Sequence, residues 1–399
     1  MKNASSWLLF QQCFGYGTTT CSRLLEQFGH PREIFDLPAE EREAIPGLSG
    51  REKAAVRRAA AADTEKILEF CAHFGCQLLT PDDREYPQRL RNIYAPPAVL
   101  YVLGELRGLD DALAIAVVGT RRYTDYGRRA AETIAGQLAA RGVVIVSGMA
   151  LGIDGIAQAA ALRAGGRTIA VTGSGIDVIY PRENETLAKQ IVEKGGAVIT
   201  EFPPGARPMA YHFPIRNRVI SGLCQGTLVV EGSRRSGSLI TAGHALAQDR
   251  DVFAVPGNIF SPGSAGPNWL ISEGAKITCC CADILSEYEH FLPGEPEKTE
   301  KVFADPFDKP AGNGYNEPKA QAESAAGHGR SDGETACFGT AALNENQRRV
   351  YEALTGGPCS SDQIVAATGL AVGTVLSALT QLEICGLIRV YPGRLFSRR

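Results

Sequence analysis

Residues 115–148, IAVVGTRRYTDYGRRAAETIAGQLAARGVVIVSG, decide the fold. A short run rich in Val and Ile ends in a glycine turn, a helical pattern follows, and a second Val/Ile run ends in Ser-Gly. Continuous apolar strands that alternate with helices are typical of a parallel sheet covered by helices on both faces. The stretch therefore predicts a strand–helix–strand unit of a doubly wound α/β domain.

The same pattern continues on both sides of this stretch. Between about residues 80 and 290 the short apolar runs are IAVVG, VVIVSG, TIAVTG, AVITE, TLVVEG and DVFAVPG. Nearly all of them are followed by a glycine-bearing turn and a helical pattern. We expect a doubly wound, Rossmann-like parallel sheet core over residues 79–292.

The regions around this core differ in character. Residues 1–78 show apolar residues at helical spacing, with the turns FGYGT and IPGLSG between helices, as in SAM-like or helix-hairpin-helix modules. A plain helical accessory domain is an equally good interpretation. Residues 293–340 are rich in Pro, Gly, Glu, Lys and Ala with little periodicity, which predicts a flexible linker.

Residues 341–399 have the element order of a winged-helix domain. The pattern predicts a helix capped by Asn344, a second helix opening at Ser360 or Ser361, a third helix ending at Gly386, and two strands around a Pro-Gly turn. The third helix contains no Lys or Arg, so a protein contact is at least as well supported as duplex reading. Residues that could still touch DNA are Arg394, Arg398 and Arg399.

Bulk composition excludes several classes of protein. The 399 residues carry a net charge of −3, so any anion site must come from local clustering. Eleven cysteines without a CxxC pair predict free thiols in a reducing compartment and no metal site. There is no run of about 18 apolar residues and no signal-peptide pattern, so we expect a cytoplasmic protein without a membrane span.

Local charge does cluster after two of the apolar runs. Between Ala206 and Arg235 there are five arginines and one acid, Glu231, which is a local net charge of +4. Aromatic residues lie beside the arginines, and Arg next to aromatic rings suits a ligand with phosphates and bases. No G-K-[ST] tripeptide and no nucleophile elbow occur, and no nucleophile, base and orienting residue can be named together. We therefore assign no catalytic residue and no cofactor.

Seven motifs together resemble the DprA/Smf DNA-processing family. They are VVGTRR, SGMALGIDGIAQAAAL, GSGIDVIYPREN, TEFPPG, FPIRNRVISGL, VVEGSRRSGSLITAGHALAQDRDVFAVPG and GPNWLISEGA. The resemblance implies a non-catalytic protein that binds and protects single-stranded DNA. It also implies loading of RecA during natural transformation and dimerisation through the Rossmann domain.

The resemblance also implies a set of DNA-binding residues. These are Thr120, Arg121, Gly148, Gly173, Ser174, Gly175, Arg182, Phe213, Arg216, Asn217 and Arg218. Asn217 is expected to position neighbouring backbone. Residues two apart on a helix diverge by about 200°, so one of Arg216 and Arg218 should hold a phosphate while the other braces the fold against a carboxylate. We favour Arg218 for the DNA contact, and burial of Arg218 against Glu201 or Glu231 would reverse this assignment.

Two other functions remain open on the sequence. A nucleotide-processing enzyme of the phosphoribohydrolase-like group would need Glu231 as its acid, although the P-G-G-x-G-T-x-x-E signature is absent. A winged-helix transcription regulator is opposed by the apolar third helix. Asp154 and Asp177 are expected to cap helices, and His212 and His244 to make structural hydrogen bonds.

Overall fold

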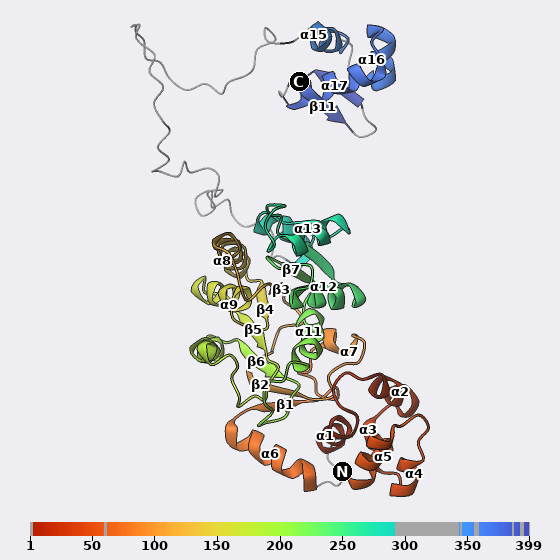
Figure 1. Ribbon diagram of the computed structural model, residues 1–399, viewed down its shortest axis with the longest axis vertical. Helices are drawn as coiled ribbons and strands as arrows, with labels where there is room; N and C mark the ends of the chain where they lie inside the picture. Colours follow the sequence, from red (N-terminus) through yellow and green to blue (C-terminus); the bar gives the residue numbers. More distant parts are fainter. Residues whose placement is uncertain are drawn as a thin grey trace. The chain divides into compact units, whose positions relative to one another are not determined.

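The computed structural model describes residues 3–59, 62–291, 343, 345–354, 359–384, 387–391 and 395–398. The chain divides into two compact units, Met1–Phe303 and Ala304–Arg399 (Figure 1). Among the described helices, none is long and apolar enough to cross a membrane.

The first unit is built around a nine-stranded sheet with the order β1-β2-β6-β5-β4-β3-β7-β8-β9. From β6 to β9 all neighbouring strands are parallel, whereas β2 is antiparallel to β6 and β1 is antiparallel to β2. The strands are β1 (Gln77–Leu79), β2 (Leu100–Gly104), β3 (Ala114–Val118), β4 (Val144–Ser147), β5 (Thr168–Val171), β6 (Ala197–Thr200), β7 (Gly226–Val229), β8 (Asp251–Ala254) and β9 (Lys276–Ile277). The predicted doubly wound core is confirmed, and each of the six apolar runs forms one strand.

Both faces of the sheet are buried, which explains why its strands are mostly apolar. Along β3, Ala114, Ala116 and Val118 pack into the hydrophobic cluster on one face, while Ile115 and Val117 pack into the cluster on the other. Side chains of a strand alternate between its faces, so both sets of side chains of a strand covered on both sides pack against helices.

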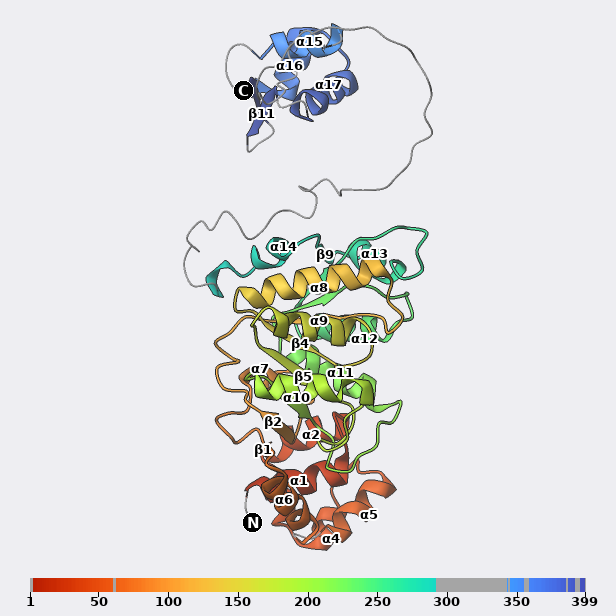
Figure 2. The same ribbon diagram turned by 90° about the vertical axis from the view of Figure 1, so that its left-hand side faces the viewer.

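Helices cover the two faces in separate layers. In Figure 1, α8 and α9 lie on one side of the sheet and α11 and α12 on the other, and Figure 2 shows α8, α9 and α10 side by side on the near face. The helices of this region are α7 (Gln88–Arg91), α8 (Asp125–Ala140), α9 (Ile153–Arg163), the 3-10 helix η1 (Arg182–Asn184), α10 (Glu185–Glu193), α11 (His212–Gly222), α12 (Gly237–Ala247), α13 (Ala265–Ser272), α14 (Cys281–Leu285) and η2 (Glu289–Phe291).

The N-terminal helices share a hydrophobic core with the β2–β6 side of the sheet. Trp7, Phe10 and Leu24 belong to the same buried cluster as Tyr101 of β2 and Val198 of β6. The predicted boundary at residue 78 therefore crosses a continuous core. These helices are α1 (Asn3–Phe14), α2 (Thr19–Phe28), α3 (Pro31–Phe35), α4 (Ala39–Glu43), α5 (Gly50–Arg58) and α6 (Ala62–Phe74).

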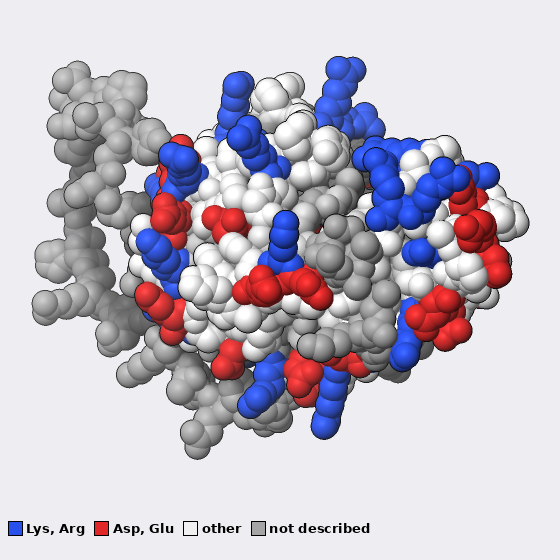
Figure 3. All heavy atoms as spheres, turned by 90° about the horizontal axis from the view of Figure 1, so that it is seen from below, with Lys and Arg blue, Asp and Glu red and all other residues white. Residues whose placement is uncertain are grey.

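The outer surface of these helices carries charges of both signs. Figure 3 looks onto this end of the unit and shows Lys and Arg lying among Asp and Glu. Ion pairs account for part of the mixture: Arg57 lies 2.6 Å from Glu43, and Arg32 lies 3.3 Å from Asp36.

The second unit has the predicted winged-helix order. Its elements are α15 (Glu345–Glu352), β10 (Cys359–Ser360), α16 (Ser361–Thr368), α17 (Val372–Ile384), β11 (Ile388–Tyr391) and β12 (Leu395–Arg398). Ser360 caps α16, and its side chain and that of Gln363 each accept a hydrogen bond from the other's backbone amide. The strand order β10-β12-β11 adds a short strand that the sequence did not indicate. The linker 293–340, Asn344, Gly386 and the Pro-Gly turn lie outside the described residues.

Candidate nucleic-acid interface

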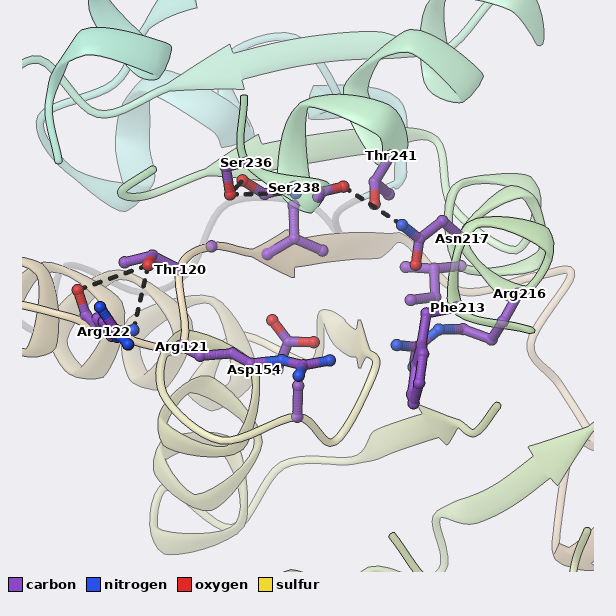
Figure 4. Close-up of a pocket in the computed structure, with 15 residues that line it drawn as sticks. Thr120, Arg121, Arg122, Asp154, Phe213, Arg216, Asn217, Ser236, Ser238 and Thr241 are labelled. Carbon is purple, nitrogen blue, oxygen red and sulfur yellow. Dashed lines mark hydrogen bonds between the residues drawn. The ribbon is translucent and has the colours of Figure 1, made fainter. Parts of the chain in front are cut away.

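A cavity of about 330 Å³ lies at the carboxyl ends of β3 and β7. Strand β3 has β4 on one side and β7 on the other, so the direction of winding reverses here. Ligands of doubly wound sheets bind at this switch point. The lining comes from the β3–α8 turn, the β4–α9 turn and the start of α9, one side of α11 and the start of α12 (Figure 4).

Two guanidinium groups flank one aromatic ring at the cavity. The Cζ atom of Arg121 lies 5.3 Å from the centroid of the Phe213 ring, and that of Arg216 lies 5.9 Å from it. Both distances fall within the range of cation–π attraction. Arg121 is exposed and Phe213 is half-buried, so a ligand can reach both.

Arg216 is buried and held mainly by backbone carbonyls. Its Nη1 donates to Gly148 O at 2.7 Å and to Val171 O, and a Cβ on Gly148 would lie 2.2 Å from that same nitrogen. A side chain at position 148 would therefore displace the Arg216 guanidinium. Burial lowers the pKa of Arg216 to about 10 and the charge of Asp154 opposes the shift, so the guanidinium stays charged at neutral pH.

Asp154 supplies the negative charge of the cavity lining. It lies in the first turn of α9 and accepts a hydrogen bond from Gly148 N at 3.1 Å. Burial raises the pKa of Asp154, while Arg216 and the amides of Gly119, Gly148 and Ala150 oppose the shift. The carboxylate thus holds the backbone of the turn before α9. It does not cap that helix, whose N-cap is Gly152 without a side-chain cap, so the expected capping role is wrong. Asp177 accepts from Gly205 N at 2.8 Å, so it braces a loop and does not cap a helix.

The start of α12 forms the other wall, which the sequence analysis did not single out. The Ser236 and Ser238 hydroxyls lie 2.9 Å apart, and Asn217 Nδ2 donates to Gly237 O at 3.3 Å. The lining residues outside the predicted set are Val118, Gly119, Arg122, Ala150, Asp154, Ile220, Ser236, Gly237, Ser238 and Thr241. The signal available was the EGSRRSGS turn, which follows a strand and so had to reach the same edge.

Arg218 lies on the other side of α11, and its assignment to DNA is reversed. It is 6% exposed, and its Nη2 lies 2.7 Å from both carboxylate oxygens of Glu201, which is 3% exposed. Burial raises the pKa of the Glu201 carboxyl, and the charge of Arg218 opposes the shift. Arg218 therefore braces the fold against a carboxylate, as one of the two arginines was expected to do.

The turn after α1 packs onto this buried pair. Gly17 has φ +62°, and a Cβ there would lie 2.5 Å from Arg218 Nε. Beside it, the ring of Tyr16 lies 4.7 Å from that of Phe202, and Gln11 Nε2 donates to Glu201 O at 3.0 Å. The FGYGT turn is therefore a docking element between the N-terminal helices and α11.

The other residues implied by the family resemblance surround the cavity at different distances. Thr120, Arg121, Phe213, Arg216 and Asn217 line it directly. Gly148 borders a smaller adjoining cavity together with Arg121, Tyr180 and Phe213.

The glycine loop after β5 lies behind the aromatic ring. A Cβ on Gly173 would lie 3.1 Å from Phe213, and His212 Nδ1 bonds to Gly173 O at 3.0 Å. Ser174 is buried and donates to Val178 O at 2.6 Å, and Gly175 N donates to Ala206 O at 2.8 Å. The loop therefore supports the ring. Arg182 is exposed on η1 and is not part of the lining.

Glu231, the acid that a nucleotide hydrolase would need, is buried and engaged. Its two carboxylate oxygens accept from Thr124 N at 2.9 Å and from Thr124 Oγ1 at 2.8 Å, and it is 2% exposed. Gly127 and Gly263 pack against it so closely that a Cβ on either would clash. Glu231 holds the start of α8 and does not line the cavity.

The winged-helix unit presents apolar side chains where a groove-reading helix needs cations. Val372 and Leu376 of α17 are 54% and 45% exposed. The guanidinium of Arg398 lies 4.4 Å from the Tyr351 ring, and its Nε donates to Tyr351 O at 2.8 Å. Arg394 and Arg399 lie outside the described residues.

The fold and the cavity define a class: Rossmann-like α/β proteins with a cavity at the switch point that is lined by arginines and an aromatic ring. The family model for DNA recombination-mediator protein A matches residues 77–289, and that for the DprA winged helix domain matches residues 338–394. The chain belongs to the DprA/Smf family.

The relatives match different shares of the chain. Protein Smf of Synechocystis is 33% identical over 404 residues, which cover 98% of both chains. Protein Smf of Escherichia coli is 47% identical over 225 residues, but the match spans only 60% of that protein and 56% of this chain. The X-ray structure of DprA from Streptococcus pneumoniae matches with a TM-score of 0.62 and 34% identity, over 71% of this chain and 97% of that one.

Proposed function

We propose that the protein binds single-stranded DNA in the cavity at the ends of β3 and β7. Phe213 between Arg121 and Arg216 carries this proposal. An aromatic ring can stack on a base, and guanidinium groups beside it can bind the adjoining phosphates. Bases of a duplex are stacked inside the helix, so a recessed ring can reach only a base that is unpaired.

We further propose that the protein protects the bound strand and loads RecA onto it in recombination and natural transformation. In this proposal it is a cytoplasmic homodimer through the Rossmann domain and has no catalytic activity. Family membership and the relatives named DNA processing protein support the role in DNA processing. The engaged state of Glu231 supports the absence of catalysis, because no free carboxylate of that loop faces the cavity.

The primary test is fluorescence anisotropy with labelled oligo-dT. Arg121→Ala and Phe213→Ala should each weaken binding about tenfold or more, since stacking on one ring contributes roughly 1–3 kcal/mol per base. Arg163→Ala, which removes an exposed cation at the far end of α9, is the matched control and should bind as the unchanged protein does. If both cavity variants kept full affinity, the site would be wrong.

Further measurements address the finer parts of the proposal. RecA filaments should form faster on oligo-dT in the presence of the protein, and light scattering should give twice the mass of the chain. Incubation with nucleoside monophosphates should release no free base. Release of base at a rate proportional to protein would overturn the non-catalytic role.

A further inference from the structure

The loop between β8 and α13 presents an apolar tip to solvent. Ile259 and Phe260 are 79% and 88% exposed. The loop is nevertheless well braced, because Gly257 and Asn268 exchange two hydrogen bonds of 3.1 and 2.9 Å, and Phe260 N donates to Asn258 Oδ1 at 2.9 Å. A braced loop that holds a large ring in water suggests a binding role, since packing does not require the ring there.

This loop is joined to the loop that forms the wall of the cavity. Gly232 N donates to Gly263 O at 2.6 Å, and Gly266 N donates to Gly232 O at 2.8 Å. A Cβ on Gly266 would lie 2.5 Å from Gly232 O, so the two loops touch without a gap. From Gly232 the chain runs within four residues to Ser236, which lines the cavity. The tip and the cavity therefore belong to one continuous ledge at the carboxyl edge of the sheet.

The ledge is cationic as well as aromatic. Arg234 and Arg235 are exposed, and neither forms an ion pair with a carboxylate of the described residues. The guanidinium of Arg234 lies 5.1 Å from the ring of Trp269 on α13. Residues 232–248 and 255–272 contain no Asp or Glu at all. The exposed Phe260 ring and the half-buried Trp269 ring, beside two exposed arginines on segments without Asp or Glu, match a strand of phosphates and bases.

We propose that this ledge, made of Arg234, Arg235, Phe260 and Trp269, is a second contact for the same DNA strand after it leaves the cavity. The inference rests on the proposed function and extends it from one unstacked nucleotide to a longer track. Phe260 stacks on a base outside the cavity, while Arg234 and Arg235 hold the intervening phosphates. The continuity with Ser236 and the charge of the ledge select DNA over an apolar partner protein.

The test is a length series of labelled oligo-dT, from about five to thirty nucleotides, with Phe260→Ser and with the double change Arg234→Ala and Arg235→Ala. The side chain of Phe260 is almost fully exposed, so its replacement should leave folding intact. We expect unchanged affinity for the shortest oligonucleotides and a loss of about five- to tenfold for the longest ones. Tyr94→Ser removes another ring, 64% exposed and outside both loops, and should show no change at any length.

The outcomes separate the two proposals. Arg121→Ala should weaken binding at every length, and its failure would remove the cavity site itself. If Phe260→Ser bound all lengths as the unchanged protein does, the ledge would not contact DNA. An equal loss at every length would place Phe260 in the cavity site instead. Unchanged DNA affinity with lost stimulation of RecA would show that the ledge takes a protein, which also overturns the inference.

Discussion

The two sides of α11 carry the same residue type in opposite roles. Arg216 faces the cavity and donates to the carbonyls of Gly148 and Val171, and the charge of Asp154 acts on it without a direct ion pair between the two described side chains. Arg218 faces inward and is neutralised by both oxygens of Glu201. The comparison teaches that the acceptor decides the role of an arginine. Carbonyl groups are uncharged and do not neutralise Arg216, whereas the carboxylate of Glu201 forms an ion pair with Arg218.

The largest effect on stability should come from breaking the buried ion pair between Arg218 and Glu201. Glu201→Gln would leave Arg218 buried without a counter-charge, and the free energy of unfolding should fall by about 3–5 kcal/mol. Denaturant unfolding measures this. Glu201→Gln combined with Arg218→Met should recover part of the loss, because no unpaired charge remains. The exposed pair Lys189–Glu185 is the control, and Glu185→Gln should cost under about 0.5 kcal/mol. Equal costs for the two Gln substitutions would contradict the assigned role.

The second largest effect on stability should come from a substitution at Gly17, in the turn that packs against Arg218. Gly17→Ala forces a Cβ against Arg218 at a positive φ and should destabilise the protein by about 2–3 kcal/mol. Gly29 also has a positive φ, of +74°, but no atom lies within 4 Å of its Cβ position. Gly29→Ala should therefore cost only about 1 kcal/mol of backbone strain. Thermal unfolding of both variants separates the steric contribution from the backbone contribution.

The cavity side should respond in binding and not in stability. Arg121→Ala should lower the slope of log affinity against log salt by about 0.7, the value for one phosphate contact on a single strand. Its free energy of unfolding should stay within about 0.5 kcal/mol, because Arg121 is exposed. Arg218→Met at neutral pH should leave the salt slope of its folded fraction unchanged. A changed slope in that variant would return Arg218 to the DNA site.

The smallest effect concerns pH at the start of α11. Burial lowers the pKa of His212, which stacks on Phe202 with ring centroids 3.9 Å apart. The unfolded chain therefore takes up the proton more readily than the folded one, so stability falls as pH drops below about 6.5. His212→Gln should reduce this fall between pH 7 and pH 5. The pKa of His244 is also lowered, so this residue contributes to the fall in the same direction. Both the unchanged protein and the His212→Gln variant retain His244, so its contribution cancels in the comparison. An identical pH profile in the variant would refute the contribution of His212.

The sequence predicts the fold well because burial on both faces of the sheet leaves a clear pattern. The six Val/Ile runs become β3 to β8, whereas β1 and β9, with three and two residues, are too short to show any period. The antiparallel β2 was missed, and its pairing with β6 could not be seen locally, because β6 lies almost a hundred residues further on.

The site is predictable in its location but not in the roles of its residues. The turns at strand ends indicate the edge, and the helical spacing of Arg216 and Arg218 correctly separates them onto two sides. Which side faces the ligand depends on Glu201, 17 residues away, and on Gly17 in another part of the chain. The pattern Arg-Asn-Arg contains neither, so the choice of Arg218 was wrong. That Arg121, Phe213 and Arg216 bind DNA stays a prediction.

The contact of Gly17 with Arg218 has a consequence for how the first unit unfolds. The N-terminal helices share a hydrophobic core with the sheet and cover the buried Arg218–Glu201 pair. Their unfolding would expose both the core and the ion pair to water. The N-terminal helices and the sheet should then melt as one cooperative block, with a single calorimetric peak for this unit. Detachment of the N-terminal helices would expose the side of α11 that carries Arg218 to water. The position of Phe213 and Arg216 on the opposite side of this helix therefore depends on the turn at Gly17.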